Sequence, residues 1–142
     1  MKKIYILIVL LLLITACGKE VKKLDINKAS VAIEESLDNM VNIDGETLEK
    51  VYGVSLSNIE EFIVKQNGDG DMYAIIKPKD KAKVQKDMEG YFSIIKKYNK
   101  EFEPDRLETL ENRLEKEIGD YLIYIVSENS EDIYKDVLDI IK

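Results

Sequence analysis

The sequence lacks histidine and tryptophan altogether, and it contains a single cysteine. Without histidine, the chain has no usual general base, no usual zinc ligand and no usual partner for activating a serine or cysteine nucleophile. One cysteine cannot form an internal disulfide. An enzyme built from this chain would depend on carboxylates, lysine, tyrosine or an oxygen-ligated metal. The composition therefore predicts a protein that is not an enzyme and carries no cofactor.

Positive charge is also in short supply. The chain has 21 lysine and arginine residues against 28 aspartate and glutamate residues, so its net charge is −7. A general nucleic-acid binder shows a basic surplus, and no nucleic-acid partner is expected here. Arg106 and Arg113 are the only arginines, while lysine, isoleucine and asparagine are frequent. This preference indicates an AT-rich genome, and we expect a Gram-positive source.

The longest apolar run, from Ile4 to Ile14, contains 11 residues and follows Lys2 and Lys3. As a helix at 1.5 Å per residue it spans roughly 17 Å, which is too short for a hydrocarbon core of about 30 Å. A positive start, a short apolar core and small residues before a cut are typical of a secretory signal. The run therefore predicts export.

The residues that end this run, Ile14-Thr15-Ala16-Cys17, have the form of a lipobox. We expect residues 1–16 to be a cleaved lipoprotein signal, 17–27 a lipidated tether and 28–142 a single α+β domain. Two acyl chains on Cys17 would anchor the protein stably, since one chain binds membranes only marginally. The predicted location is the outer face of the cytoplasmic membrane. The alternative is an ordinary secretory signal that happens to contain a cysteine.

The rest of the chain alternates between helical and strand-like segments. We expect helices near residues 28–40, 46–52, 81–98, after Pro104 and at 130–142, and strands near 60–66, 72–77, 113–118 and 121–127. The expected N-terminal caps are Asp25 or Asn27, Asp44, Asp80 and Ser130. The longest helix has an inward stripe at Val84, Met88, Tyr91, Ile95 and Tyr98. These segments predict an α+β fold with a small antiparallel sheet, built from two hairpins and packed against helices.

Several short motifs punctuate this pattern between Tyr52 and Ser127. They are Tyr52-Gly53, Ile59-Glu60-Glu61, Tyr98 with Pro104 after it, Leu110-Glu111-Asn112, and Gly119-Asp120-Tyr121 before an apolar strand. In these motifs the chain resembles the small lipoproteins of Gram-positive bacteria, mostly clostridial, that carry the domain-of-unknown-function 4358 family. It departs at Met72-Tyr73, where the family pattern has an acidic residue before the strand. The resemblance implies a membrane-anchored extracytoplasmic domain, and it implies no known activity or functional residues.

Asn67, Asp69 and Asp71 alternate as the ligands in the first half of a calcium loop do. Such a loop needs glycine at its sixth position and glutamate at its twelfth, where this chain has Met72 and Pro78. Asn, Asp and Gly also favour hairpin turns for backbone reasons alone. The sequence favours a turn, with these three residues as weak candidates for a calcium or magnesium site.

Lysines are concentrated between Lys77 and Lys100, a segment that contains eight lysines and only three acidic residues. From Glu101 to Lys142 there are 13 acidic and five basic residues, so the chain is electrically lopsided. One interpretation is that the lysine-rich segment faces anionic lipid or a wall polymer. The other, which we favour, is a solvated helix face.

Two further groups of side chains are candidates for chemistry. A tyrosine-lined groove for sugar or peptide would use members of the set Tyr52, Tyr73, Tyr91, Tyr98, Tyr121, Tyr124 and Tyr134. A carboxylate hydrolase would pair two members of the set Glu108, Glu111, Glu115 and Glu117. At these spacings we expect the tyrosines to lie mostly in or beside the core and the glutamates to face solvent.

The sequence therefore predicts a non-enzymatic lipoprotein. Its expected role is to bind another envelope protein or a wall component, while lipid on Cys17 holds it at the membrane. The alternative is a small solute-binding accessory of an envelope transporter. A third class, an enzyme using carboxylates or an oxygen-ligated metal, would require several acidic side chains to converge in one cleft.

Overall fold

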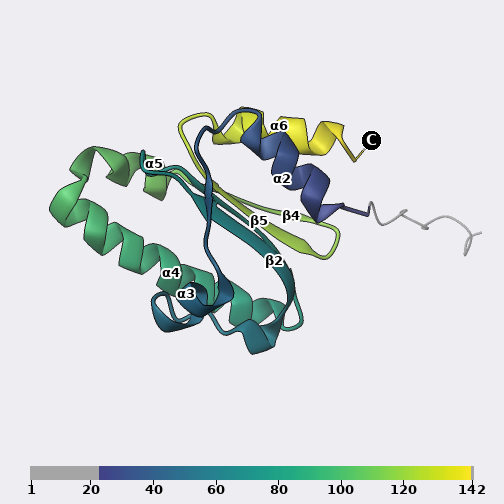
Figure 1. Ribbon diagram of the computed structural model, residues 1–142, viewed down its shortest axis with the longest axis horizontal. Helices are drawn as coiled ribbons and strands as arrows, with labels where there is room; N and C mark the ends of the chain where they lie inside the picture. Colours follow the sequence, from purple (N-terminus) through teal and green to yellow (C-terminus); the bar gives the residue numbers. More distant parts are fainter. Residues whose placement is uncertain (1–22, 142) are drawn as a thin grey trace, which may run out of the picture.

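A five-stranded antiparallel sheet organises the computed structural model, which describes residues 23–141 (Figure 1). Its strands are β1 (Val41–Asn42), β2 (Ile59–Gln66), β3 (Met72–Pro78), β4 (Leu114–Ile118) and β5 (Tyr121–Val126). Their order across the sheet is β1-β2-β3-β5-β4. The hairpins β2–β3 and β4–β5 meet through β3 and β5, and every pair is antiparallel. The predicted α+β class is confirmed.

The central strands β3 and β5 are buried on both faces, and this is why their sequences are almost continuously apolar. Ile75 pairs with Ile123 at the middle of their ladder. The edge strand β4 differs, because its middle residues Glu115, Lys116 and Glu117 are all exposed. The sheet therefore has helices on both faces and a charged strand along one edge.

One face of the sheet packs against α4 (Lys81–Phe102), with α3 (Gly45–Lys50), α5 (Leu107–Glu111) and the 3-10 helices η1 (Leu56–Asn58) and η2 (Pro104–Arg106) around it. Val84, Met88 and Tyr91 of α4 are buried, as the predicted stripe requires. They pack against sheet residues that include Ala74 and Ile76. This layer forms the larger of the two apolar cores.

The other face packs against α2 (Ile26–Glu34) and α6 (Ser130–Asp139), which lie side by side in Figure 1. Ile33 and Ile133 meet Tyr73 and Ile125 of the sheet in a second apolar core. A polar contact also joins this layer to the sheet. Glu34 accepts hydrogen bonds from Lys65 at 2.6 Å and from the Tyr73 hydroxyl.

Three predicted caps are confirmed. The carboxylates of Asp25, Asp44 and Asp80 accept hydrogen bonds from backbone N–H groups in the first turns of α2, α3 and α4. The prediction for Ser130 is wrong, because Ser130 is the first residue of α6 and is itself buried. Helix α2 begins at Ile26 and Leu24 is 4% exposed, so the folded part starts before Lys28, the expected boundary.

Two helix ends differ from the prediction. Helix α2 ends at Glu34 instead of near Met40, and a turn follows in which Asn39 has a φ of 56°. The chain then forms the short strand β1. Two residues are too few to show the alternation of apolar and polar positions that identifies a strand in sequence. Helix α4 continues to Phe102, beyond the expected end at Tyr98. Its last turns therefore carry residues that do not face the core.

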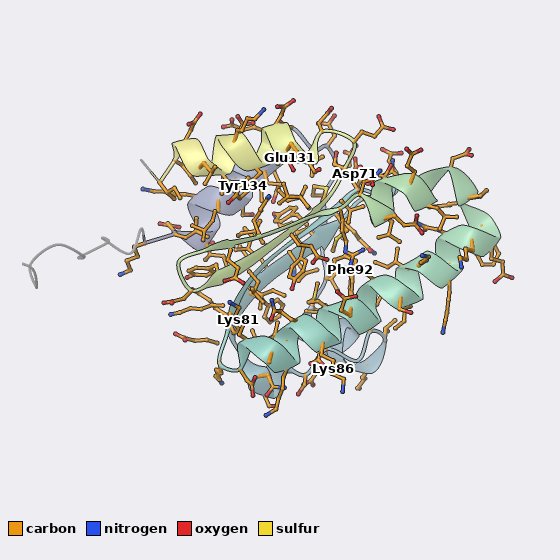
Figure 2. The ribbon with its side chains drawn as sticks, turned by 180° about the vertical axis from the view of Figure 1, so that it is seen from behind. Asp71, Lys81, Lys86, Phe92, Glu131 and Tyr134 are labelled. Atoms are coloured by element: carbon orange, nitrogen blue, oxygen red, sulfur yellow. The ribbon has the colours of Figure 1, made fainter. Side chains whose placement is uncertain are left out.

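Different elements of the fold lie at the two ends of the long axis of the molecule. The described chain begins beside the N-terminus of α2, whereas the C-terminal half of α4 and α5 lie at the opposite end (Figures 1 and 2). Lys81 and Lys86 lie near the N-terminus of α4, on the side from which the chain enters (Figure 2). Within residues 23–141, no helix combines the length and apolar character needed to span a bilayer.

Candidate functional site

A cleft of about 490 Å³ lies between the C-terminal half of α4, the end of α3 and the β2–β3 turn. We call it the α4 cleft. Its walls come from the chain after α3, the β2–β3 turn with its flanks, and α4 with its cap. The lining residues are Val51, Tyr52, Gln66, Asn67, Gly68, Gly70, Asp71, Met72, Ile94, Ile95, Tyr98, Asn99, Glu103, Leu110 and Val126. Three distant parts of the chain therefore build one site. Its volume lies within the range typical of small-ligand pockets.

Apolar side chains of the α4 cleft are unusually exposed. Val51, Ile94 and Tyr98 expose 59%, 38% and 52% of their surface. Phe102, one turn beyond Tyr98, exposes 62%, and the two rings lie 5.0 Å apart. The apolar surface thus continues out of the cleft along α4. Contiguous apolar patches of this kind mark sites of interaction in soluble domains.

One buried polar side chain lies in this apolar setting. Asn99 lines the cleft and is 6% exposed. Its backbone carbonyl accepts the N–H of Glu103 at 2.9 Å, but its side-chain amide bonds to no other residue in the described part of the chain. Neither its oxygen nor its nitrogen is among the fully buried side-chain atoms that lack a partner, so both stay accessible from the cleft. The cleft therefore offers a ligand one amide donor group and one acceptor.

The charged residues of the cleft are acidic. Asp71 is paired with Arg106, whereas Glu103 makes no ion pair with any residue between 23 and 141. Among the residues that the structure describes, no lysine or arginine lines the cleft. Its field therefore favours a neutral or cationic ligand over an anionic one.

Tyr52 lines the cleft and packs against the apolar core. Its ring lies 4.4 Å from that of Tyr91, which is fully buried. The Tyr91 hydroxyl has no hydrogen-bond partner among the described residues. Burial, with the neighbouring Tyr52, raises the pKa of Tyr91 well above its ordinary value. Tyr91 is therefore a neutral support for the wall of the cleft.

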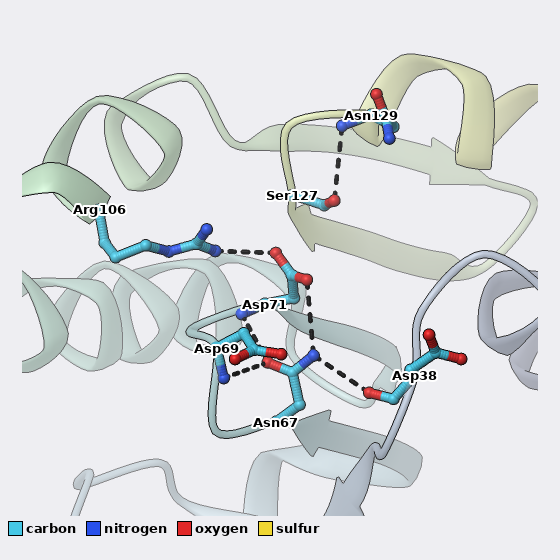
Figure 3. Close-up of polar contacts among 7 residues, drawn as sticks. All are labelled: Asp38, Asn67, Asp69, Asp71, Arg106, Ser127 and Asn129. Carbon is cyan, nitrogen blue, oxygen red and sulfur yellow. Dashed lines mark hydrogen bonds and ion pairs between the residues drawn. The ribbon is translucent and has the colours of Figure 1, made fainter.

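The candidate metal residues Asn67, Asp69 and Asp71 form the β2–β3 turn (Figure 3). The Asn67 side-chain oxygen accepts the backbone N–H groups of Asp69 and Asp71, each at 3.0 Å. The Asn67 amide donates to the carbonyl of Asp38 at 3.1 Å. In the part of the chain that the structure describes, no three acidic or cysteine side chains are grouped to hold a metal ion. The three residues make a turn, as the sequence favoured.

An ion pair fixes this turn against the helical layer. Arg106 Nη2 lies 2.8 Å from Asp71 Oδ1, and both side chains are about four-fifths buried. Gly70 has a φ of +85°, and a Cβ there would lie 2.8 Å from Arg106 Nε. The close approach of Arg106 and the positive φ both require glycine. The β2–β3 turn is therefore held in a fixed position, where it forms one wall of the α4 cleft.

The glutamates considered as an acid–base pair are not brought together. Glu111, Glu115 and Glu117 pair instead with Lys96, Arg113 and Lys81, at 2.6, 2.7 and 2.6 Å. Each of these three carboxylates thus has its own cation, whereas Glu108 makes no ion pair within residues 23–141. This arrangement supplies no shared cleft for glycoside chemistry.

The lysine-rich segment is partly neutralised. Lys77 and Lys83 pair with Glu60 and Asp80 at 2.7 and 2.9 Å, and Lys81 and Lys96 have the partners just described. Lys77, Lys79 and Lys81 border a polar hollow of about 630 Å³ with Glu60 and Glu117. Because the charges there are mixed, this hollow has no strong preference for an anion.

Of the seven tyrosines considered as groove residues, only Tyr52 and Tyr98 line the α4 cleft. Tyr73, Tyr91 and Tyr124 are buried core residues. The prediction that Tyr98 faces inward is wrong. Position 98 lies almost two helical turns after the buried Tyr91, and therefore on nearly the same face, yet Tyr98 is 52% exposed, whereas Asn99 is 6% exposed. Asn99 was missed, although a polar residue four positions after Ile95 is a readable signal.

A second groove of about 530 Å³ runs between α2 and α6. Val31 and Ile140 expose 62% and 42% of their surface there. The polar residues that line it in the described chain are all exposed, so none is a buried polar side chain like Asn99. The α4 cleft is therefore the better candidate. Cys17, the predicted lipidation site, lies outside the described residues.

Comparison with known proteins gives one match. A family model with the description "Domain of unknown function (DUF4358)" matches residues 33–127. No curated protein and no solved structure matches the chain. Every residue that lines the α4 cleft falls within the matched segment, whereas α6 lies beyond it.

Proposed function

Since this chain belongs to the Domain of unknown function (DUF4358) family, whose description names no activity, we propose its function from its own residues. It is a non-enzymatic binding module of the cell envelope. Lipid on Cys17 holds it at the outer face of the cytoplasmic membrane of a Gram-positive bacterium. The α4 cleft is the surface with which it binds another envelope protein or a wall component.

The observation that carries this proposal is the exposed apolar surface of α4. Tyr98 and Phe102 project from the last turns of a helix that extends past the core. Burying such side chains is favourable by roughly 25 cal/mol per Å² of apolar area, so a partner that covers them gains affinity. Aromatic side chains in a pocket are also the usual anchors of protein interfaces.

The orientation of the domain supports the same proposal. The chain enters the domain beside α2, and the C-terminal half of α4, whose residues line the cleft, lies at the far end of the long axis (Figure 1). A domain tethered through its N-terminus would therefore hold the cleft away from the bilayer. That position suits a partner reached from the wall side.

Site-specific photo-crosslinking in living cells tests the proposal. The photoreactive residue p-benzoylphenylalanine replaces Phe102 in one strain and Glu131, an exposed residue of α6, in another. We expect a discrete crosslinked species from position 102 and none from position 131. A second substitution, Tyr98→Ser, should reduce the yield at position 102. Equal products from both positions, or none from position 102, would contradict the proposal.

A second candidate is a solute-binding accessory of an envelope transporter. The volume of the α4 cleft, about 490 Å³, and its two tyrosines favour this candidate. A thermal-shift screen with amino acids, wall sugars and divalent metals tests it, because a ligand of the folded state raises the melting temperature. A shift with one solute class that disappears in Tyr98→Ser would favour solute binding over a protein partner.

A further inference from the structure

We propose that the α4 cleft recognises a peptide segment with one apolar side chain next to a positive charge. The apolar side chain enters the cleft, a backbone peptide group pairs with Asn99, and the positive charge lies beside Glu103. This inference rests on the proposed function, because it names the chemistry of the partner at the same site. Four features of the cleft carry it.

The first feature is the apolar interior. Ile94, Ile95, Leu110 and Val126 line the cleft together with the ring of Tyr52. Leu110 and Val126 are 2% exposed, so the deep wall is already held in place by the core. An apolar or aromatic side chain of the ligand is therefore well matched to these walls.

The second feature is the Asn99 side chain. Its amide offers two donor hydrogens and an acceptor oxygen, and neither end has a partner among residues 23–141. A peptide group offers one donor and one acceptor, so it can satisfy both ends of the amide. A pure hydrocarbon ligand would leave the amide buried and unsatisfied, which is unfavourable. The polar group therefore selects a peptide-like ligand.

The third feature is the sign of the charge. Glu103 lies at the end of α4 and lines the cleft without an ion pair in the described structure. Asp71 is neutralised by Arg106 at 2.8 Å. A cationic group near Glu103 gains a charge-assisted contact, whereas a carboxylate or phosphate meets an unbalanced negative charge.

The fourth feature is the extent of the apolar surface. The cleft ends near Tyr98, but the apolar surface continues to Phe102, whose ring contacts that of Tyr98. A ligand confined to the cleft would leave Phe102 exposed. A peptide extending beyond its anchor residue covers both rings. The surface therefore favours a chain segment over a free amino acid or sugar.

The test uses the full chain reconstituted in phosphatidylcholine nanodiscs, with empty nanodiscs as the blank for isothermal titration calorimetry. The main probe is the tripeptide acetyl-Lys-Phe-Lys-amide. Acetyl-Glu-Phe-Glu-amide reverses its charge, acetyl-Lys-Ser-Lys-amide removes its apolar anchor, and N-acetylphenylalanine amide removes its flanking residues. We expect the main probe to bind at least about tenfold more tightly than each of the other three, equivalent to about 1.4 kcal/mol.

Two variants assign the contacts. Asn99→Leu, which is similar in volume and cannot hydrogen-bond, should weaken binding of the main probe by about tenfold, as loss of a buried hydrogen bond requires. Glu103→Gln should weaken the main probe while improving the glutamate probe. Glu101→Gln is the matched control, since Glu101 is exposed on the same helix and does not line the cleft. Melting curves confirm that each variant is folded.

The outcomes separate this inference from the proposed function. Equal affinity for the lysine and glutamate probes would overturn the inference, as would binding unaffected by Asn99→Leu. Equal affinity for N-acetylphenylalanine amide would also overturn it, in favour of a free solute. If no probe binds but Phe102 still yields its crosslink, the ligand chemistry is wrong and the proposed function stands. If both experiments fail, the proposed function is wrong as well.

Discussion

The hydroxyl oxygens of Tyr73 and Ser30 lie 2.7 Å apart in the interior, and this contact joins α2 to the central strand β3. Glu34 completes the cluster, because it accepts a hydrogen bond from the Tyr73 hydroxyl and another from Ser30 at 3.1 Å. The contrasting residue is Tyr91 on the other face of the sheet. Its hydroxyl is buried with no partner among the described residues.

The two tyrosines should therefore respond oppositely to loss of the hydroxyl. Tyr73→Phe removes the hydroxyl that donates to the part-buried Glu34 and contacts the buried Ser30, so it should lower the free energy of unfolding by about 1–3 kcal/mol. Tyr91→Phe removes an unsatisfied polar group and should leave stability unchanged or raise it. Urea unfolding of the two variants checks this difference. An equal loss in both would show that the Tyr73 cluster contributes no net stability.

Glu34 should make stability depend on acid. Burial alone raises the pKa of this carboxyl, but hydrogen bonds from Lys65, Tyr73 and Ser30 outweigh burial and hold the pKa below its ordinary value of 4.5. A carboxyl with a lowered pKa in the folded state stabilises the protein above its unfolded pKa. That stabilisation is lost as the pH falls below 4.5 and through the folded pKa.

The measurement is the melting temperature of wild type and Glu34→Gln between neutral pH and about pH 3. We expect the gap between the two proteins to be largest near neutral pH and to shrink on acidification below the ordinary pKa. Glu35→Gln, the exposed neighbour in sequence, is the control and should follow wild type. A gap that stays constant with pH would contradict the assignment.

The wall of the α4 cleft should be sensitive at Gly70 and tolerant at Gly68. Gly70→Ala forces a side chain onto a positive φ and against Arg106, so it should cost about 1–2 kcal/mol or more. A Cβ at Gly68 meets no atom within 4 Å, so Gly68→Ala should be nearly neutral. Thermal unfolding distinguishes the two. Similar losses would mean that the turn is held by something other than the Arg106 contact.

Anchoring should depend on Cys17 alone. Replacing Cys17 with serine removes the thiol that lipidation requires, so the protein should lose incorporation of labelled palmitate and leave the membrane fraction. Metabolic labelling and cell fractionation measure both effects. The substitution Asn27→Ser, in the first turn of α2, is the matched control. Labelled palmitate on the Cys17→Ser protein would show that another residue carries lipid and would contradict this prediction.

Local chemistry was the part of the fold that the sequence predicted well. Asp25, Asp44 and Asp80 cap helices through contacts with residues two or three positions away, so a short window of sequence contains all the information. The apolar run of β5 likewise identified a central strand, because burial on both faces leaves almost no polar positions.

The candidate site could not be predicted in the same way. The α4 cleft joins Val51, Asn67 and Asn99, which are far apart in sequence and meet only through the sheet order and the overhang of α4. Because the sequence predicted that α4 ends at Tyr98, it did not predict the part of the helix that continues to Phe102. Asn99 gains its meaning from burial without a partner, a property that exists only in the folded chain.

The charged edge strand β4 has a consequence for copies of this protein that stand close together on one membrane. Lipid anchoring, as proposed, would confine the molecules to two dimensions and raise their effective concentration. An exposed strand edge then becomes a template for pairing between sheets. Strand β4 is five residues long, and Glu115, Lys116 and Glu117 fill its centre. Neighbours at high density would therefore be able to meet without their sheets pairing through β4, which would leave the α4 cleft of each copy accessible.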